Sequence, residues 1–595
     1  MRASLVPIFW LLMLPVCFLR AESGIRADYE DSPGIEASVL SPYKVTGGLS
    51  GYLPYRVTLK NPTSKDRTWS VQSSNKINAG NGAMQASMNI EIDCPANSEV
   101  TRDILVPVPP VLSNAYNVQS RINLRLHGDR SHSDYEHGSA TPEWPGVAIS
   151  KHLANRNLSD LKSEAKKRAP GSYGENFGLV TNVGALGEDW RGLSSVDVFM
   201  LSDNEWEEMG ARQRRSVDEW IHLGGTLDIY SKDKDKAKSL GPFGFGPVAE
   251  GKVKLSAGLG RIRLLSYDGR DLDAKQVTGR IVASEVRNRC KELSSDFRRA
   301  WGVSDLLEIR PFRAAFWLGL LTIFAVLVGP INLFLLTGKD RRHRLFITTP
   351  IISLVASLIL GAFILVVDGF GGKGHRFSVV ELQPGEGGRS AYLTQQSIAS
   401  TGLLTTSAFR DENPSLHVPV VLAPSRWSRL EGDGSDSGNF DVRPDGTHHG
   451  SWFRSRSRHG FVSQTVIPSR ARFELAGDRD APALVSGLGF TADKVFYIDD
   501  SGAIWQSEGP VSTGQRADLV KATEKEFSDW KKDEISPASS GLKKDLRTLG
   551  RTHGHFYTST SEATGLELDL LASLRWQSST SFVFGPVTVA GESEG

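Results

Sequence analysis

The chain has 595 residues, and at about 150 residues per domain this length predicts about four structural units rather than one small domain. Its 69 lysines and arginines nearly balance its 68 aspartates and glutamates, so there is no overall basic field to bind nucleic acid through its phosphates. Three cysteines are too few for a disulfide-stapled scaffold or for a zinc or iron–sulfur site built from cysteines.

The first residues have the layout of a secretory signal peptide. Arg2 precedes an apolar run, Leu5–Leu19, which is followed by Arg20 and Ala21. A basic start, a short apolar region and a small residue at the end are typical of such signals. We predict that residues 1–21 are a signal peptide cleaved near Ala21, with an uncleaved membrane anchor as the alternative.

Two long apolar segments lie in mid-chain, at residues 314–336 and 345–367. Each has 23 residues and no charged side chain, which is long enough to cross about 30 Å of hydrocarbon as a helix. The loop between them, Gly338–Arg344, carries four lysines and arginines, and such loops tend to face the cytoplasm. Together with the export signal, this predicts a transmembrane hairpin in a bacterial inner membrane, with both large parts of the chain outside the cytoplasm.

The first span contains the sequence Gly329-Pro330-Ile331-Asn332. Proline removes a backbone hydrogen bond and bends a helix, and an asparagine in lipid needs an internal partner. We expect Asn332 to bond to a freed carbonyl or to the second helix. A transport path is the alternative, but neither span contains the charged residues that a relay would need.

Short segments with alternating apolar residues, separated by turn residues, fill residues 30–112. Within Tyr55–Leu59 the apolar residues occupy every second position, as on a strand with one buried face. This spacing predicts an immunoglobulin-like β-sandwich, a module that binds or spaces, followed by a linker over residues 113–145. The clearest predicted strands are Ile35–Leu40, Tyr55–Leu59, Ser87–Ile92 and Val100–Val106.

Residues 146–285 have the pattern of an α/β domain. Asp203 can cap a helix that ends at Gly224-Gly225, and the strand Thr226–Tyr230 follows. A strand, a helix and a strand in this order predict a βαβ unit with a parallel sheet. The strands expected before the helix are Gly146–Ile149, Phe177–Val180 and Val196–Ser202.

These residues resemble a known family. Val196–Tyr230, with Leu201-Ser202-Asp203, Gln213 and Gly224-Gly225, is similar to the class I glutamine-amidotransferase-like (flavodoxin-like) domain of uncharacterised bacterial membrane proteins that also have an N-terminal Ig-like sandwich and a transmembrane hairpin. Gly258–Ile262 resembles the Gly-x-Gly-Arg-Val stretch near the end of such domains, and the resemblance spans Gly146–Asp368. It implies partnership with envelope complexes that contain von Willebrand-type or ATPase components.

The sequence departs from active amidotransferases, which need a cysteine nucleophile on a tight turn after a strand. The stretch directly after Thr226–Tyr230, Ser231–Lys236, contains no cysteine. Cys94 lies in the sandwich and Cys290 lies before the membrane segment, each without a neighbouring histidine. We therefore expect structural or idle thiols, and whether the two form a disulfide is left open.

From residue 373 the chain returns to short strands and turns, which predicts a C-terminal all-β domain over residues 373–595. A helix is expected at Arg516–Lys532, and Asp499–Gly502 has the composition of a hairpin turn. The predicted strands are Arg376–Leu382, Val418–Leu422, Phe461–Ile467, Ala471–Leu475, Val495–Ile498 and Ser581–Phe584.

Two stretches are rich in possible metal ligands. Glu431–Gly438 lacks the bidentate glutamate of a helix–loop–helix calcium site. The other stretch matches no defined spacing and holds His127, Asp129, His132, Asp134, Glu136 and His137. We interpret both as solvated loops. The sequence has no serine-nucleophile elbow or phosphate-loop motif, so we assign no catalytic, cofactor-binding or metal residue, and no cofactor.

The sequence thus predicts a membrane-anchored extracytoplasmic protein, a non-enzymatic scaffold or sensor whose partners are the lipid bilayer and envelope proteins, with any small-molecule ligand unspecified. One alternative is a hydrolase in which Ser231, Asp203 and a histidine such as His222 converge within hydrogen-bond reach. Another is a carbohydrate- or peptide-binding module whose groove is lined by tryptophans, for which core packing is the simpler interpretation. The tryptophans in question are Trp427, Trp452 and Trp505.

Overall fold

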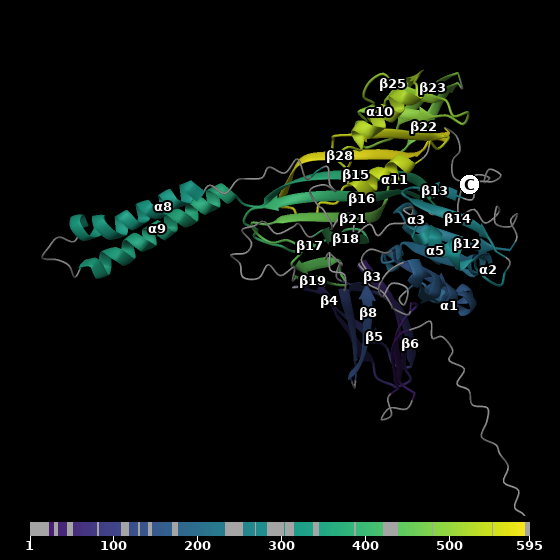
Figure 1. The fold of residues 1–595 in the computed structure, drawn as a ribbon, viewed down its shortest axis with the longest axis horizontal. Coiled ribbons are helices and arrows are strands. Elements are labelled where there is room, and N and C mark those ends of the chain that lie inside the picture. The colour runs from purple at the N-terminus through teal and green to yellow at the C-terminus, as the bar shows by residue number, and fades with distance from the viewer. Residues whose placement is uncertain are drawn as a thin grey trace, which may run out of the picture.

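The computed structural model describes most of the chain, namely residues 23–28, 34–43, 51–79, 82–108, 118–128, 131–140, 145–168, 177–232, 254–267, 269–282, 303, 314–336, 344–385, 388–420, 438–478, 480–549 and 551–589. The protein is multidomain and rich in β-sheet. A helical hairpin projects from a body in which two β-rich units and one α/β unit adjoin (Figure 1). The expected signal peptide, the basic loop 337–343, Cys290, Trp427 and most of the acidic loop 431–438 lie outside the described residues.

The N-terminal unit consists of two β-sheets that share one apolar core. One sheet has the antiparallel order β1-β2-β3-β6, formed by β1 (Ser23–Asp28), β2 (Glu36–Ser41), β3 (Gly51–Asn61) and β6 (Ser98–Val108). The other includes β4 (Arg67–Ala79), β5 (Gly82–Cys94), β7 (Val118–His127) and β8 (Ser131–Ala140). Val57 and Leu59 of the first sheet and Val71 and Ile90 of the second belong to the same buried cluster. The four strands predicted here are all present.

The linker predicted over residues 113–145 is wrong for its described part, because β7 and β8 pair there as an antiparallel hairpin beside β4. In β7 the side chains of Ile122, Leu124 and Leu126 are buried and alternate with exposed or half-exposed neighbours. This is the period of a strand with one buried face. The N-terminal unit therefore extends beyond the expected limits 30–112 in both directions, through β1 before residue 30 and through β7 and β8 after residue 112.

A later part of the chain completes the second N-terminal sheet. β19 (Gly438–Val442) pairs in parallel with β5, and β20 (Thr447–Gly450) and β17 (Phe409–Arg410) continue the sheet beyond it. The two β-rich units are consequently joined by main-chain hydrogen bonds between segments about 350 residues apart, since Asn439 is the neighbour of Gln85.

The α/β unit is a sheet with helices on both faces. Its order is β10-β9-β11-β12-β14-β13, where the first five strands are parallel and β13 is an antiparallel edge strand. Helices α1 and α5 pack on one face, and α3 packs on the other. The elements are β9 (Val147–Ser150), α1 (Lys151–Arg168), β10 (Leu179–Thr181), β11 (Val198–Ser202), α2 (Asp203–Glu208), α3 (Ala211–His222), β12 (Thr226–Ser231), β13 (Lys254–Ala257), β14 (Gly260–Ser266) and α5 (Ala274–Val282).

The predicted βαβ unit is confirmed, because β11 and β12 are parallel neighbours joined by helix. The single helix expected from Asp203 is instead two helices, α2 and α3. Helix α2 starts one residue earlier than expected, since Ser202 forms a capping box with Glu205. The backbone of Met209 and Gly210 is extended, which separates the two helices.

The C-terminal unit is built on a 12-stranded sheet in the order β18-β21-β16-β15-β28-β27-β24-β25-β26-β23-β22-β29. The strands are β15 (Gly372–Gly385), β16 (Gly388–Thr401), β18 (Ser415–Val420), β21 (Arg458–Pro468), β22 (Phe473–Asp478), β23 (Ala481–Ser486), β24 (Lys494–Ile498), β25 (Ile504–Ser507), β26 (Arg516–Lys521), β27 (His555–Thr560), β28 (Leu574–Pro586) and β29 (Thr588–Val589). All the predicted strands correspond to strands of this sheet.

This unit is not purely β, because α10 (Glu524–Glu534) and α11 (Ser540–Thr548) pack on the sheet. The helix expected over Arg516–Lys532 is correct only in its second half. Its first six residues form β26, which pairs with β23 and β25. Thr523 then caps α10 through a capping box with Glu526, and this fixes the start of the helix.

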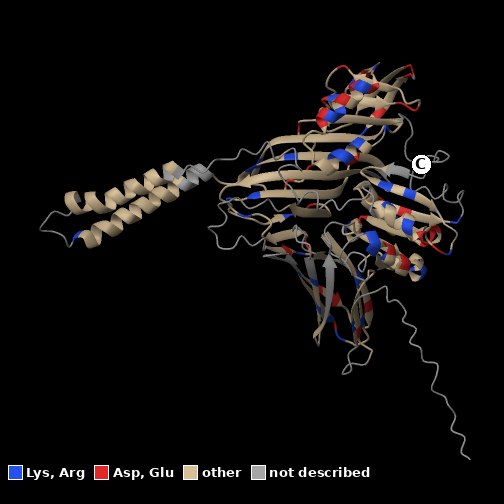
Figure 2. Ribbon diagram, in the orientation of Figure 1, with Lys and Arg blue, Asp and Glu red and all other residues tan. Residues whose placement is uncertain are grey.

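The hairpin consists of α8 (Ala314–Val326), which continues as a π-helical segment over Leu327–Leu336, and α9 (Leu345–Asp368). Both helices are long and apolar enough to cross a membrane. Phe334 is 76% exposed and Phe346 is 85% exposed, which in water would leave a large apolar surface unburied. Figure 2 shows no charged residue along the described middle of either helix.

Asn332 makes the inter-helix contact that its sequence context predicts. It is fully buried between the two helices, and its Nδ2 donates a hydrogen bond to Oγ1 of Thr349 in α9 at 2.9 Å. Pro330 lies two residues earlier inside the π-helical segment. A bond to the second helix was one of the two partners expected for Asn332. Packing within the hairpin thus accounts for this polar residue.

Candidate ligand pocket at the carboxyl edge of the parallel sheet

A cavity of about 680 Å³ opens at the edge of the α/β sheet where the parallel strands end. The chain runs from β9 outward to β10 on one side and then to β11 on the other side of β9. Ligands of open α/β sheets bind outside the carboxyl ends of the strands at such a reversal. The lining residues are His152, Leu153, Asn155, Arg156, Asn157, Asp203, Asn204, Lys232, Tyr267, Gly269 and Arg270.

Segments after four parallel strands supply these side chains. The group from His152 to Asn157 occupies the first two turns of α1, directly after β9. Asp203 and Asn204 begin α2 after β11, and Lys232 follows β12. The segment from Tyr267 to Arg270 follows β14. Because parallel strands end at the same edge, residues far apart in the sequence meet around one cavity.

The charges around the cavity favour an anion. Arg156, Lys232 and Arg270 contribute three positive side chains against the single carboxylate of Asp203. Helix α1 has 18 residues and its first turn borders the cavity. The N-terminal end of a helix carries a partial positive charge and N–H groups that can bind an anion. The side chains and the end of the helix therefore both favour a negatively charged ligand.

Asp203 is held in place from two sides. Its Oδ2 accepts a hydrogen bond from Oγ of Ser231 at 2.7 Å, and its Oδ1 accepts one from the backbone N–H of Asn204 at 2.9 Å. Ser231 is buried and ends β12. The serine thus positions the carboxylate that borders the cavity.

The loop after β14 closes the cavity against α1 and Lys232. Asn157 in α1 accepts a hydrogen bond on Oδ1 from the backbone N–H of Leu272 at 2.7 Å, which ties the loop to the helix. Gly269 has a φ of +82°, and a Cβ built on it would lie 1.6 Å from Cε of Lys232. Glycine at this position therefore lets the aliphatic stem of Lys232 lie directly against the loop backbone.

The structure brings together only part of the triad that the hydrolase alternative requires. Ser231 and Asp203 meet, but His222 ends α3 at the opposite edge of the sheet. β12, which begins just after His222 and ends at Ser231, rises about 16 Å at 3.3 Å per residue. Nδ1 of His222 is instead 2.8 Å from Oε2 of Glu381 in β15.

Two tryptophans of the carbohydrate or peptide alternative, Trp452 and Trp505, pack in cores, and Trp427 lies outside the described residues. Trp452 is buried among Phe409, Phe440 and Phe453. Trp505 is buried, and its Nε1 donates a hydrogen bond to Oδ2 of Asp499 at 2.9 Å. Neither side chain offers an exposed aromatic platform.

The remaining sequence candidates have simple structural roles where they are described. Cys94 is a buried free thiol next to the carbonyl oxygen of Leu59. Nδ1 of His127 is 2.7 Å from Oγ of Ser131 in the adjoining strand. Among the described residues, the histidine and acidic side chains that converge closely enough to hold a metal ion are Asp411, His417 and His448 rather than members of the 127–137 stretch.

Sequence reasoning missed the cavity residues from α1 and from the loop after β14, above all His152, Arg156 and Arg270. One signal was present in the sequence. His152 and Arg156 come directly after a predicted buried strand of a parallel sheet, which is where ligand-binding residues of such sheets lie. Arg270 follows β14, which ends at Ser266 with the apolar residues Leu264 and Leu265 before it.

Comparisons with known proteins give no family. No family model and no curated protein matches the chain. Among solved structures, the E. coli curli protein CsgC is 10% identical and has a TM-score of 0.10, over 20% of this chain and 94% of its own. The yeast delta-COP-I mu-homology domain is 9% identical, with a TM-score of 0.18 over 37% of this chain and 97% of its own. A Bacteroides uniformis beta-glucuronidase is 10% identical, with a TM-score of 0.16 over 36% of this chain and 24% of its own. At TM-scores this low, the similarity carries no information about function.

Proposed function

We propose that this chain is a membrane-anchored extracytoplasmic sensor in a bacterial envelope complex, and that its α/β unit binds a small anionic ligand without transforming it. The observation that carries the proposal is the cavity at the carboxyl edge of the parallel sheet. Its three positive side chains, Arg156, Lys232 and Arg270, outnumber one carboxylate, and the first turn of α1 borders the same space.

The order of the parts supports a sensor that transmits binding to other proteins. The hairpin fixes the body to the bilayer, while the α/β unit contacts both β-rich units. Tyr52 of β3 donates its backbone N–H to Oγ of Ser194 at 2.9 Å, and Gln464 of β21 donates from Nε2 to the carbonyl oxygen of Leu223 at 2.7 Å. A change in the α/β unit on ligand binding would therefore reach surfaces on both neighbours.

The strand order of the α/β unit agrees with the family resemblance. The order β10-β9-β11-β12-β14 follows the flavodoxin-like pattern, in which the second strand lies outside the first. This supports an amidotransferase-like assignment for residues 146–285. Two packed sheets, in which the strands of the N-terminal unit itself pair antiparallel, support an Ig-like assignment for that unit. The turn directly after β12 contains no cysteine, so we propose binding rather than amide chemistry.

Inorganic phosphate is a suitable first probe. The thermal unfolding midpoint of the full chain in detergent micelles is expected to rise with phosphate in a saturable way, because a ligand that binds only the folded state stabilises it. Arg270→Gln and Lys232→Gln should remove most of this rise. Arg212→Gln is the matched control, since Arg212 is exposed and pairs with Glu188 outside the cavity. An equal rise in sodium chloride of the same ionic strength, or in both cavity variants, would contradict the proposal.

A hydrolase is the second candidate, and the 2.7 Å contact between Ser231 and Asp203 is the observation that favours it. Ser231 is 1% exposed and its hydroxyl already donates a hydrogen bond to the carboxylate of Asp203, so a nucleophilic role would require it to move. Turnover of p-nitrophenyl phosphate or p-nitrophenyl acetate by the full chain, lost in Ser231→Ala and retained in Ser195→Ala, would favour the hydrolase over the sensor.

Location and partners need separate measurements. Alkaline phosphatase fused at the C-terminus should be active and the same enzyme inserted at Lys339 should be inactive, because this reporter works only after export. Crosslinking in intact membranes followed by affinity purification should recover a reproducible set of envelope proteins. Recovery of a lone monomer would contradict the role in a complex while leaving ligand binding unaffected.

A further inference from the structure

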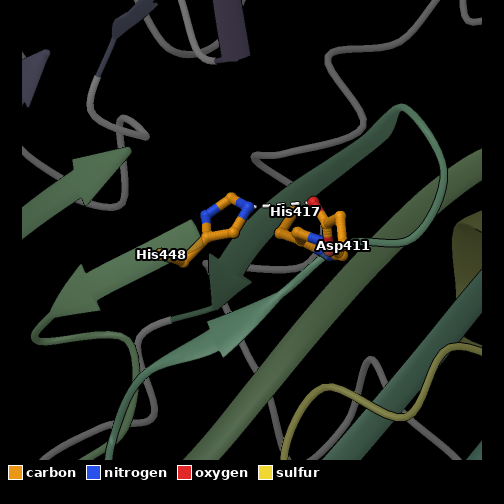
Figure 3. A group of neighbouring side chains, drawn as sticks. All are labelled: Asp411, His417 and His448. Carbon is orange, nitrogen blue, oxygen red and sulfur yellow. Dashed lines mark hydrogen bonds and ion pairs between the residues drawn. The ribbon is translucent and has the colours of Figure 1, made fainter. Parts of the chain in front are cut away.

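A second cluster of ligand-type side chains lies away from the cavity, at the junction of the two β-rich units. Asp411 follows β17, His417 lies in β18, and His448 lies in β20. β17 and β20 are neighbours at the end of the seven-stranded sheet, whereas β18 is the first strand of the 12-stranded sheet. Figure 3 shows the three side chains converging from these separate segments.

The donor atoms are already close together. Oδ1 of Asp411 is 2.8 Å from Nε2 of His417, and Oδ2 is 2.9 Å from Nε2 of His448. One ligand atom from each residue lies within 4.8 Å of the other two. Two imidazole nitrogens and one carboxylate form a frequent ligand set for zinc and for related divalent transition metals. At metal–ligand distances of about 2.0–2.1 Å, tetrahedral ligand atoms are about 3.3 Å apart, so the two Asp–His contacts would open by about 0.5 Å, and any longer separation among the three ligand atoms would have to close.

The surroundings orient the ligands as a metal site requires. Nδ1 of His417 is 2.9 Å from Oγ of Ser463, which is fully buried in β21. A hydrogen bond from the second ring nitrogen to a fixed group holds a metal-bound histidine in its orientation. The Phe409 ring stacks on that of His448 with centroids 4.5 Å apart. The aromatic ring thus shields the ligands from bulk water on that side.

Two buried polar atoms beside the ligands have no hydrogen-bond partner among the described residues. They are Nδ1 of His448 and Nε1 of Trp452. The Trp452 ring lies 4.9 Å from that of His448 and 6.4 Å from that of His417, centroid to centroid. Buried polar groups are rarely left unsatisfied. Nδ1 of His448 points away from Nε2, the ligand atom, so a water held as a fourth metal ligand could serve only Nε1 of Trp452.

We propose that Asp411, His417 and His448 bind one divalent transition-metal ion of the zinc class, which fastens the two β-rich units together. β18 contacts β3 of the N-terminal unit, since a Cβ at Gly51 would lie 3.2 Å from Cδ1 of Leu416. The ion would therefore hold β18 of the 12-stranded sheet to β17 and β20, which continue the N-terminal sheet beyond β19. This inference is independent of the proposed anion pocket.

The test measures bound zinc on the full chain in detergent micelles. The protein is stripped with a chelator, loaded with zinc sulfate, desalted and analysed by elemental mass spectrometry. We expect about one tightly held zinc per chain in the wild type and at least about a ten-fold loss of affinity in Asp411→Asn and His448→Gln. His127→Gln is the matched control, because it removes a histidine of the 127–137 stretch, and it should retain the ion.

Two further measurements keep the proposal testable if the ligand variants do not fold. Ser463→Ala removes only the support of His417 and should weaken zinc affinity about ten-fold. Cobalt loaded in place of zinc into the wild type should give visible absorption bands of a four-coordinate site. A wild type that retains no zinc and shows no cobalt bands, or zinc lost in His127→Gln and kept in His448→Gln, would overturn the proposal and leave a hydrogen-bonded Asp–His–His cluster.

Discussion

Nδ1 of His222, at the end of α3, lies 2.8 Å from Oε2 of Glu381 in β15, and both side chains are buried. The imidazole also stacks on the Tyr392 ring at a centroid distance of 4.5 Å. This pair therefore joins the α/β unit to the C-terminal sheet through a charged contact that water does not reach. A buried pair of this kind makes the junction sensitive to pH.

The first prediction concerns that sensitivity. Burial lowers the pKa of His222, but Glu381, Asp218 and Glu219 outweigh it and raise the pKa to about 9. The folded state therefore keeps a proton that the unfolded chain loses above about pH 6.5. The free energy of unfolding that this proton contributes is fully present below pH 6.5 and is lost as the pH rises through 9. At 1.36 kcal/mol per pKa unit, the loss is about 3 kcal/mol.

Unfolding midpoints of the full chain between pH 6 and 9.5 check this prediction. The wild type should lose stability across that range, whereas Glu381→Gln should be less stable at pH 6.5 and nearly insensitive to pH up to 9. Glu508→Gln, which changes an exposed carboxylate on the same unit, should behave as the wild type. The prediction is wrong if both variants keep the wild-type slope.

The same histidine shows how far sequence reasoning extends. His222 ends a helix that the spacing of Val217, Trp220 and Ile221 predicts, and these side chains are buried on the expected face. Its partner Glu381 lies 159 residues further along, in a strand whose existence was predicted but whose position was not. Local periodicity reports which face of an element is buried; it does not report which distant element covers that face.

Other parts of the fold also divide into features that a local sequence pattern predicts and features that depend on contacts between distant segments. The apolar hairpin and the role of Asn332 could be predicted because lipid leaves few ways to satisfy a polar group. β8 was missed because its sequence, SHSDYEHGSA, is polar and lacks a buried-strand pattern. The parallel pairing of β5 with β19 and the cavity with its Arg270 both depend on long-range topology, which no local pattern encodes.

A second prediction concerns the buried ion pair between Asp228 in β12 and Arg263 in β14. The two residues are direct neighbours across the parallel strands, and Nη2 of Arg263 lies 2.8 Å from Oδ2 of Asp228. Removing one partner leaves the other charge buried and uncompensated, which costs about 3–5 kcal/mol. Asp228→Asn should therefore lower the free energy of opening of β12 and β14 by that amount, measured by native-state hydrogen exchange.

The exposed pair Arg56–Asp103 provides the control, because it has the same arginine–aspartate chemistry between neighbouring strands β3 and β6. Its side chains are 36% and 39% exposed, so Asp103→Asn should cost less than about 1 kcal/mol. The double variant Asp228→Leu, Arg263→Met should be more stable than Asp228→Asn. Equal effects at the two pairs would contradict burial as the cause.

A third prediction concerns Gly269 beside the anion pocket. Alanine there would adopt an unfavourable positive φ and its Cβ would displace the stem of Lys232. Gly269→Ala should therefore weaken stabilisation by phosphate while leaving circular dichroism of the full chain unchanged. Gly489→Ala, at a position with no heavy atom within 4 Å, is the control. Undiminished phosphate binding in Gly269→Ala would exclude Lys232 from the site.

The fourth prediction concerns the contact between Asn332 and Thr349 in the hairpin. Hydrogen bonds between membrane helices contribute about 0.6 kcal/mol on average and about 1.7 kcal/mol at most. A double-mutant cycle with Asn332→Leu and Thr349→Val should give a coupling energy in this range, measured by reversible unfolding of the full chain in mixed micelles. The hydrogen bond spans 2.9 Å between the two helices, so each single variant should loosen the hairpin.

Thr348 provides a matched control for the hairpin, because its Oγ1 donates a hydrogen bond to the carbonyl oxygen of Arg344, the residue directly before its own helix, at 3.1 Å. Thr348→Val removes a hydroxyl next to Thr349 without touching the other helix, so it should show no coupling with Asn332→Leu. A coupling energy within error of zero for Thr349→Val as well would mean that apolar packing, rather than this hydrogen bond, holds the two helices together.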